Sequence, residues 1–122
     1  MEDKKELESE IMRRIQVKAS TLGARLWRNN VGTYNFNGSW VKYGIQNPGG
    51  SDLIGFTQRR ITKEMVGMVV PIFTAIEVKS ANGKLSKEQS AFIEFLAKQN
   101  AVVGVCRSTD ELEKVIGTTN GL

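Results

Sequence analysis

A strand–helix–strand passage in the second half of the chain constrains the fold more than any other feature. The segment PIFTAIEVK (71–79) is rich in apolar and β-branched residues, as buried strands are. A helix is predicted next over 86–100, because Ser86 and Gln89 have the spacing of a capping box. The run AVVGVCR (101–107) follows as a second buried strand. Such a crossover joins parallel neighbours with a right-handed turn, so the passage predicts a parallel strand pair.

The rest of the chain adds a helix at each end and further strands, from apolar periodicity and turn residues. The predicted elements are a helix at 5–22, short strands at 25–30 and 52–56, a loop or irregular hairpin at 31–51, a turn at 57–69, and a last helix from Ser108 to about Ile116. We therefore expect one α/β domain over residues 1–122, with a mixed β-sheet flanked by helices in the order α-β-β-β-α-β-α.

The absence of histidine narrows the chemistry that this chain can perform. No histidine and a single cysteine, Cys106, occur among the 122 residues. This composition excludes Ser-His-Asp and Cys-His catalysis, histidine-ligated zinc, internal disulfides and cysteine-rich zinc sites. Cys106 itself stands in an apolar run and is interpreted as a small buried hydrophobe. Any catalysis must use carboxylates, lysine, hydroxyl groups or a metal ion bound through oxygen.

The charge is unevenly distributed along the chain. Residues 11–107 carry 14 Lys and Arg against five Asp and Glu, although the whole chain has a net charge of only +4. A basic body suits a polyanion such as nucleic acid, with an ordinary solvated surface as the alternative. No run of 18 apolar residues occurs, and the N-terminal MEDKKELESE lacks the apolar centre of a signal peptide. We expect an intracellular protein.

A carboxylate within the strongest predicted strand is the first candidate for a functional site. Glu77 lies in an apolar strand, where a carboxylate is costly unless it is paired or bound to a metal ion. Side chains alternate along a strand, so Glu77 and Lys79 share a face with Cα atoms about 7 Å apart. The alternative is a Glu–Lys pair at the solvent end of an edge strand.

Asp52 is the second candidate carboxylate. It follows Gly49, Gly50 and Ser51, where an Asp is most often a turn residue. It also begins a short strand that we expect to neighbour the strand of Glu77. Two carboxylates on adjacent strands can hold Mg²⁺, which takes oxygen ligands and usually keeps several waters.

The spacing of these residues resembles the PD-(D/E)XK nuclease signature, in which Asp52 is followed by Glu77-Val78-Lys79. Three ordered strings look like the VRR-NUC branch: GGSDLIG (49–55), IEVK (76–79) and GKLSKEQ (83–89). That branch includes small stand-alone phage nucleases and the nuclease domain of a eukaryotic interstrand-crosslink repair enzyme. The resemblance covers nearly the whole chain and implies a restriction-endonuclease-like core.

The resemblance also implies a set of site residues. Asp52, Glu77 and the backbone carbonyl of Val78 would bind Mg²⁺ or Mn²⁺, and Lys79 would orient or polarise the attacking water. A metal ion lowers the pKa of a water that it binds, and positive charge stabilises the transition state. The implied catalytic residues are Glu8, Asp52, Glu77, Lys79 and Gln89.

Two of these residues, Glu8 and Gln89, have alternative interpretations. The family has a glutamate three residues before an isoleucine on its first helix, as Glu8 precedes Ile11; a solvated glutamate near a helix N-terminus is the alternative. Glu8 borders the expected buried face of that helix, whereas Glu10 falls on a more solvated face, and the choice between them stays open. Gln89 either closes the capping box with Ser86 or points toward the metal site.

The expected partner is DNA, which cations and aromatic side chains would contact. The candidate phosphate contacts are Arg28, Lys42, Arg59, Arg60 and Lys84, which would supply salt-sensitive affinity without sequence preference. Trp40 and Tyr43 could stack on bases or pack in the core.

These observations predict a metal-dependent, structure-specific DNA endonuclease. Stand-alone relatives of this kind act as homodimers on four-way junctions, so we expect a homodimer that resolves Holliday junctions or other branched DNA. A bacterial cytoplasm is the expected setting, with a phage as a possible source. The alternatives are a non-catalytic nucleic-acid-binding protein and a sequence-specific restriction-type endonuclease.

Overall fold

The computed structural model describes residues 7–117. The chain divides into two compact units, Met1–Thr62 and Lys63–Leu122, and each is described by itself. The single domain expected over 1–122 stays a prediction. Within the described residues, no helix combines the length and the apolar character needed to cross a membrane.

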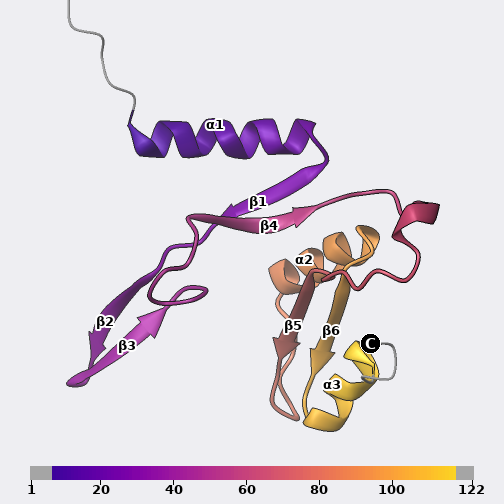
Figure 1. Cartoon of the computed structure of the whole chain (residues 1–122). Helices are drawn as coiled ribbons and strands as arrows, with labels where there is room; N and C mark the ends of the chain where they lie inside the picture. The colour runs from indigo at the N-terminus through magenta and orange to yellow at the C-terminus, as the bar shows by residue number, and fades with distance from the viewer. Residues whose placement is uncertain (1–6, 118–122) are drawn as a thin grey trace, which may run out of the picture. The chain divides into compact units, whose positions relative to one another are not determined.

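The described residues of the first unit form one helix and two antiparallel strand pairs. Its elements are α1 (Glu8–Thr21), β1 (Ala24–Arg28), β2 (Gly32–Phe36), β3 (Ser39–Tyr43) and β4 (Leu53–Thr57). β1 pairs with β4, with Arg28 opposite Leu53, and β2 pairs with β3 as a hairpin (Figure 1).

Helix α1 packs on β1 through a narrow face. The least exposed residues of the helix are Met12, Gln16 and Ala19, spaced by four and three, and Ala19 is buried. The side chain of Gln16 donates a hydrogen bond to the Leu26 carbonyl of β1 at 3.2 Å. Ile11 and Ile15, which are 41% and 46% exposed, lie outside this face.

The segment between β1 and β4 contains a regular hairpin, which decides between the two predicted alternatives for 31–51. Asn37 and Gly38 form its two-residue turn, both with positive φ, as type I′ turns require. The side chain of Asn35 accepts a hydrogen bond from the Gly38 amide at 3.0 Å and supports the turn. Two additional strands therefore appear in the element order.

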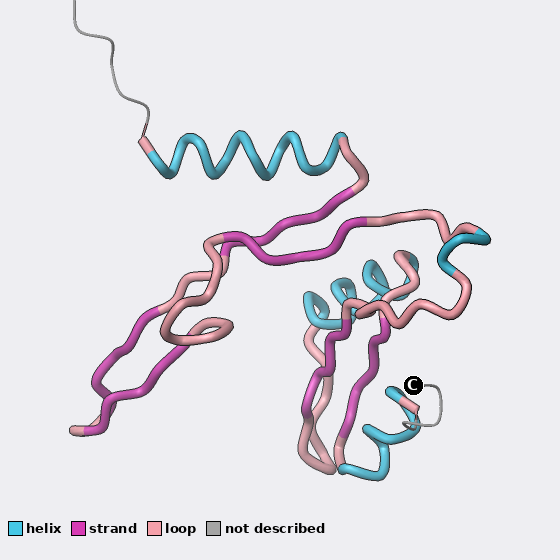
Figure 2. Tube along the Cα trace, in the orientation of Figure 1, coloured by secondary structure: helices cyan, strands magenta, loops and turns pink. Residues whose placement is uncertain are grey.

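The second unit contains the predicted strand–helix–strand passage. Its elements are the 3₁₀-helix η1 (Lys63–Met65), β5 (Thr74–Val78), α2 (Lys87–Lys98), β6 (Val102–Cys106) and α3 (Thr109–Ile116). β5 and β6 are parallel, as predicted, with Glu77 opposite Val105. Long loop segments flank η1 between β4 and β5 (Figure 2).

The core of this unit lies where α2 and α3 pack against β6. Leu96 of α2 is fully buried, and Cys106 at the end of β6 is 5% exposed, which confirms its prediction as a buried hydrophobe. Gly104 of β6 faces Val115 of α3 so closely that a Cβ at position 104 would overlap its methyl groups. The glycine therefore allows α3 to approach the strand.

The predicted α/β class is confirmed, and the arrangement is compatible with a restriction-endonuclease-like core. The strands form three two-stranded sheets, β1–β4, β2–β3 and β5–β6, with both parallel and antiparallel pairing. β5 begins at Thr74, later than the strand expected at 71–79. Pro71 has no backbone N–H to donate to a ladder, which favours a later start.

Candidate active site

Glu77 occupies the face of β5 that the alternation of side chains predicts. Its strand is held by the parallel ladder with β6, in which Ile76 pairs with Gly104 and Glu77 with Val105. The carboxylate side chain is 30% exposed, which leaves it accessible but partly shielded from water. A half-buried carboxylate on a regular strand has a well-defined direction, because its backbone is fixed by the ladder.

Lys79 stands directly after β5, and its backbone continues the ladder. Its amide donates to the Cys106 carbonyl at 3.1 Å. The Lys79 ammonium Nζ lies 3.6 Å from Glu77 Oε1, and the lysine side chain is only 19% exposed. Glu77 and Lys79 therefore share a face, as predicted, and they form an ion pair, which is what the alternative interpretation of these two residues expected.

Gln89 joins the same cluster from helix α2. Its Nε2 donates a hydrogen bond to Glu77 Oε1 at 2.9 Å. The same side chain also closes the capping box: its Oε1 accepts from the Ser86 amide at 2.9 Å, and its own amide donates to Ser86 Oγ at 3.0 Å. The capping-box interpretation of Gln89 is therefore confirmed, and the other end of the same amide group contacts Glu77; a role of Gln89 at a metal site stays a prediction.

The two partners of Glu77 act on one carboxylate oxygen. Gln89 Nε2 and Lys79 Nζ both approach Oε1, at 2.9 and 3.6 Å. These two partners hold Oε1 and partly neutralise its charge, and an ionised carboxylate has a second oxygen that can accept a ligand. An ionised carboxylate is a suitable ligand for a hard cation.

Arg107 holds the loop that leaves this cluster, and the sequence analysis did not single it out. Its Nη1 donates to the carbonyls of Ser80 and Gly83, at 2.5 and 2.8 Å. These carbonyls lie in the turn between Lys79 and Lys84. The only signal in the sequence was a cation immediately after a buried strand, which does not identify the carbonyls that it meets.

Asp52 belongs to the first unit and lies immediately before β4. It is exposed, and its carbonyl oxygen accepts a hydrogen bond from the Asn29 amide at 2.8 Å. The hydrogen-bonded partner of β4 is β1, and that of β5 is β6. The expected convergence of Asp52 with Glu77 therefore stays a prediction and belongs to the proposed function.

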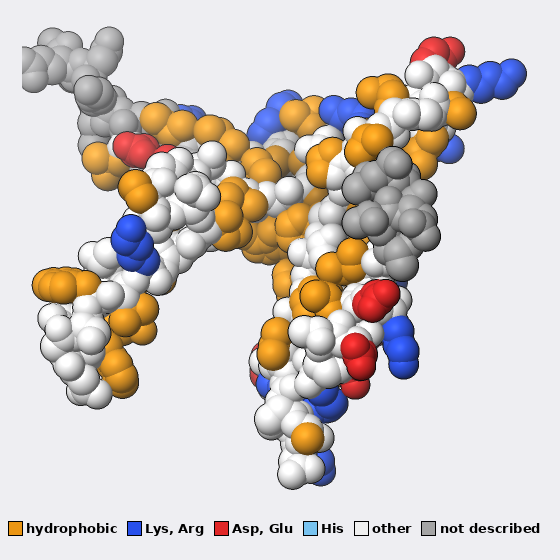
Figure 3. Space-filling view, turned by 60° about the horizontal axis from the view of Figure 1, so that its bottom comes forward, with side chains coloured by type: hydrophobic (Ala, Val, Ile, Leu, Met, Phe, Trp, Pro, Cys, Tyr) orange, Lys and Arg blue, Asp and Glu red, His pale blue; other side chains and the backbone are white. Residues whose placement is uncertain are grey.

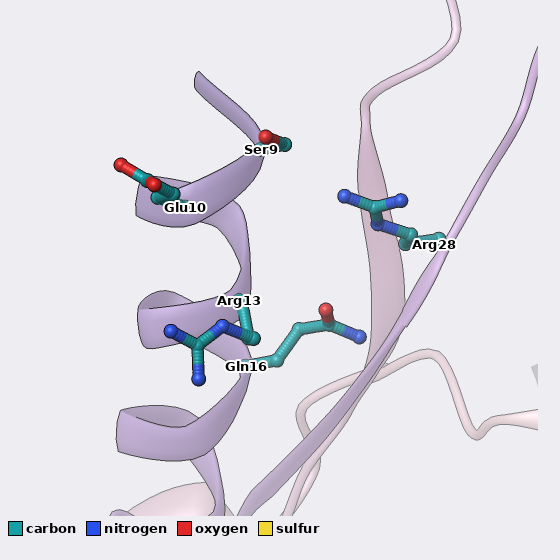
Figure 4. A pocket seen from close by; sticks show the side chains of 5 residues that line it. All are labelled: Ser9, Glu10, Arg13, Gln16 and Arg28. Carbon is teal, nitrogen blue, oxygen red and sulfur yellow. The ribbon is translucent and has the colours of Figure 1, made fainter. Parts of the chain in front are cut away.

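The candidate acids of α1 lie in its first turn. Glu8 is exposed at the first residue of the helix, and the Glu10 carboxylate accepts a hydrogen bond from the Leu7 amide at 3.4 Å. A surface hollow of about 410 Å³ next to them is lined by Ser9, Glu10, Arg13, Gln16 and Arg28. Gln16 and Arg28 extend toward each other in this hollow, and Glu10 points away from Arg28 (Figure 4).

The five candidate phosphate contacts are exposed and belong to different elements. Arg28 ends β1, Lys42 lies in β3, Arg59 and Arg60 follow β4, and Lys84 precedes α2. Within each unit, the Lys and Arg side chains visible in Figure 3 lie at separate places.

The candidate stacking residues lie on the hairpin. Trp40 is 72% exposed and therefore does not pack in a core, which was one of its two predicted roles. The ring of Tyr43 contacts that of Tyr34, with centroids 6.2 Å apart. Tyr43 is therefore partly engaged within the hairpin, and Trp40 presents the more open ring.

A divalent metal ion needs several oxygen, nitrogen or sulfur ligands close together. No group of three or more His, Cys, Asp or Glu side chains gathers closely enough to hold a metal among residues 7–117. The set implied by the family is smaller, with two carboxylates and the Val78 carbonyl. Oxygen donors of this kind suit Mg²⁺ or Mn²⁺.

Comparison with known families gives the class of protein. The VRR-NUC domain model matches residues 4–110 of the 122-residue chain. The chain therefore belongs to the VRR-NUC family, a nuclease family of the PD-(D/E)XK superfamily, as the three sequence strings predicted. Searches of curated proteins and of solved structures returned no match.

Proposed function

We propose that this chain is a metal-dependent, structure-specific DNA endonuclease that hydrolyses phosphodiester bonds. The observation that carries the proposal is the contact of Lys79 and Gln89 with a single oxygen of Glu77. These residue types at this spacing are what the nuclease signature requires. Membership of a nuclease family supports the same conclusion.

The proposed metal ligands are Glu77, Asp52 and the backbone carbonyl of Val78. Glu77 contributes Oε2, because Oε1 already receives Gln89 and Lys79. Asp52 is proposed to contribute the second carboxylate. A Mg²⁺ or Mn²⁺ ion bound there supplies positive charge to the scissile phosphate and lowers the pKa of the attacking water.

Lys79 is proposed to act on the attacking water and the phosphate. The Lys79 side chain is only 19% exposed and its ammonium lies 3.6 Å from Glu77 Oε1, so its charge acts at short range. Gln89 is proposed to hold the Glu77 carboxylate in the orientation that presents Oε2. Glu8 is the proposed helical acid of the site, with Glu10 as the alternative.

Branched DNA is the proposed substrate, with a Holliday junction as the preferred case and a homodimer as the active form. Two copies of a small nuclease can cut two strands of a junction in a coordinated way. The cations Arg28, Lys42, Arg59, Arg60 and Lys84 are proposed to bind phosphates. The exposed ring of Trp40 is available to stack on a base at a branch point.

A cleavage assay tests the function directly. The wild-type protein should nick a synthetic four-way junction when Mg²⁺ is present and leave it intact when EDTA is added. Asp52→Ala and Glu77→Ala should each lower the cleavage rate by more than about a hundredfold, the order of loss expected when a preorganised charged group is removed. Binding of the junction in Ca²⁺ should persist in both variants.

Glu94→Ala provides the matched control, because Glu94 is a helix carboxylate that pairs with Lys98 on the surface at 3.5 Å. This variant should cleave at the wild-type rate. A homodimer predicts symmetric paired nicks and a mass near twice 13.5 kDa by sedimentation.

Other results would favour the alternatives. Junction binding without any cleavage in Mg²⁺ or Mn²⁺ would identify a binding protein, for which the basic composition of residues 11–107 is sufficient. Discrete bands from linear plasmid DNA would identify a sequence-specific enzyme.

A further inference from the structure

The side chain of Asn29 closes the loop that leads from the hairpin to Asp52. Asn29 follows the last residue of β1 and is half-buried. Its Oδ1 accepts from the Ile45 amide at 2.8 Å, and its Nδ2 donates to the Ile45 carbonyl at 3.0 Å. The same Nδ2 donates to the Ser51 carbonyl at 3.0 Å. One amide group therefore uses both of its N–H donors and its acceptor on the two ends of this loop.

The backbone of Asn29 adds a fourth bond, directly at Asp52. Its amide donates to the Asp52 carbonyl at 2.8 Å. The Ser51 and Asp52 carbonyls lie on the two sides of the Asp52 Cα, and Asn29 holds both. The bond to the Asp52 carbonyl continues the β1–β4 ladder by one pair, so the contribution of the Asn29 side chain is its hold on the Ser51 carbonyl, directly before Asp52.

The loop is built tightly around this side chain. Gly50 donates to the Gln46 carbonyl at 2.6 Å. A Cβ at position 50 would collide with the Ile45 carbonyl and come within 3.0 Å of Asn29 Nδ2. Asparagine is required at position 29 by its hydrogen bonds, because aspartate has no N–H to offer two carbonyl oxygens and would repel them.

We propose that Asn29 is the positioning residue for Asp52, and that it presents this carboxylate to the divalent ion. The inference rests on the proposed function, in which Asp52 is a metal ligand. Asn29 does not bind the ion itself, since its polar side-chain atoms are all engaged with Ile45 and Ser51. Its role resembles that of outer-sphere partners that orient metal ligands elsewhere.

The test compares Asn29→Ala with Asn30→Ala. The two positions are adjacent, neither change alters the charge, and Asn30 is exposed. Mn²⁺ binding to the full chain is measured by isothermal titration calorimetry, and junction cleavage is measured across a range of Mn²⁺ concentrations. Asn29→Ala should raise the dissociation constant for Mn²⁺ by about 10- to 100-fold. Asn30→Ala should change it by no more than about twofold, as expected of a surface substitution.

Rescue by metal separates positioning from general damage. If Asn29 only orients Asp52, saturating Mn²⁺ should restore most of the cleavage by Asn29→Ala, whereas Asp52→Ala should stay inactive. Junction affinity in Ca²⁺ should be unchanged in both variants. Loss of cleavage that excess Mn²⁺ does not restore would overturn the positioning role.

The outcomes distinguish this inference from the proposed function. A wild-type protein that binds Mn²⁺ and cleaves, together with an Asn29→Ala variant of equal Mn²⁺ affinity, would overturn the inference and leave the nuclease assignment intact. A wild-type protein that binds no Mn²⁺ would overturn both. If circular dichroism shows that Asn29→Ala is unfolded, Asn29→Ser keeps one donor and one acceptor and decides the question by the same titration.

Discussion

Gln89 shows how one side chain can serve both the fold and the candidate site. Its carbonyl oxygen completes the capping box of α2 with Ser86, and its amide nitrogen holds Glu77. A capping glutamine could be predicted from the sequence, because it depends on a spacing of three residues. The bond to Glu77 depends on how α2 lies against β5, which local spacing does not contain.

The two tasks of Gln89 can be separated by substitution. In Gln89→Glu, a carboxylate oxygen still accepts from the Ser86 amide, but the second oxygen faces Glu77 and repels it. We expect cleavage to fall by about 10- to 100-fold while the helix start is retained. The measurement is the junction cleavage rate at saturating Mg²⁺, alongside the thermal unfolding midpoint.

Ser86→Ala provides the opposite change. It removes the Oγ that accepts from the Gln89 amide and should cost about 1 kcal/mol of stability. Cleavage should remain near the wild-type rate, because the Gln89–Glu77 bond is kept.

Equal activity of Gln89→Glu and the wild type would show that this bond has no role in the reaction.

Asn29 and Arg107 are residues whose roles emerge only in three dimensions. Each binds backbone carbonyls of a loop next to a candidate site residue, at Ser51 for Asn29 and at Ser80 and Gly83 for Arg107. A polar residue after a strand is common, and nothing in its neighbours identifies the carbonyls that it will meet. Spacing rules apply within an element, whereas these contacts span 22 to 27 residues.

At the scale of elements, the β5–α2–β6 passage contains the candidate-site residues whose contacts with one another are described. α2 supplies Gln89, contains the fully buried Leu96 and contacts β6. Docking of this helix therefore determines whether Gln89 reaches Glu77. The packing stability of α2 and the geometry of the candidate site are therefore coupled, because both depend on this helix.

Leu96→Ala tests that coupling. Truncating a fully buried leucine should lower the free energy of unfolding by about 2–5 kcal/mol, because it removes apolar contacts and leaves a cavity. Leu22→Ala is the matched control, since Leu22 is 62% exposed and should cost little. Urea unfolding followed by circular dichroism measures both; equal midpoints would contradict the assignment of Leu96 to the core.

The β2–β3 hairpin is stabilised by different interactions from those of the β5–α2–β6 passage. Its strands pair regularly and its turn has the expected asparagine and glycine, yet Phe36 and Trp40 are 60% and 72% exposed. Sequence patterning left a loop and a hairpin as alternatives, because aromatic residues separated by Gly, Asn and Ser suit either. Ladder hydrogen bonds between β2 and β3 decided for the hairpin.

At the scale of the whole molecule, charge governs the expected interaction with DNA. The excess of cations is spread over residues 11–107 and is not confined to the site. Phosphate contacts release counterions, so affinity should fall steeply as salt increases. The same property would serve a nuclease and a pure binding protein, which is why the cleavage assay is decisive.

Arg60→Ala should lower the steepness of that dependence. Removing one phosphate contact should reduce the slope of log K against log salt by about 0.9 for duplex arms and weaken all DNA sequences similarly. Lys98→Ala is the control, because Lys98 pairs with Glu94 and is outside the proposed contacts. Fluorescence anisotropy in Ca²⁺ at several salt concentrations gives the slopes, and identical slopes for Arg60→Ala and the wild type would remove Arg60 from the interface.

The sequence by itself determined the α/β class, the parallel strand pair, the helix caps at Ser86 and Ser108, and the shared face of Glu77 and Lys79. These features follow from periodicity and from contacts between residues a few positions apart, which are written locally in the chain. Only the tertiary structure decided that Gln89 holds Glu77, that Arg107 and Asn29 anchor the loops beside Lys79 and Asp52, and that Trp40 is exposed. Such contacts depend on how separate elements pack, and packing is a property of the folded chain rather than of any short segment.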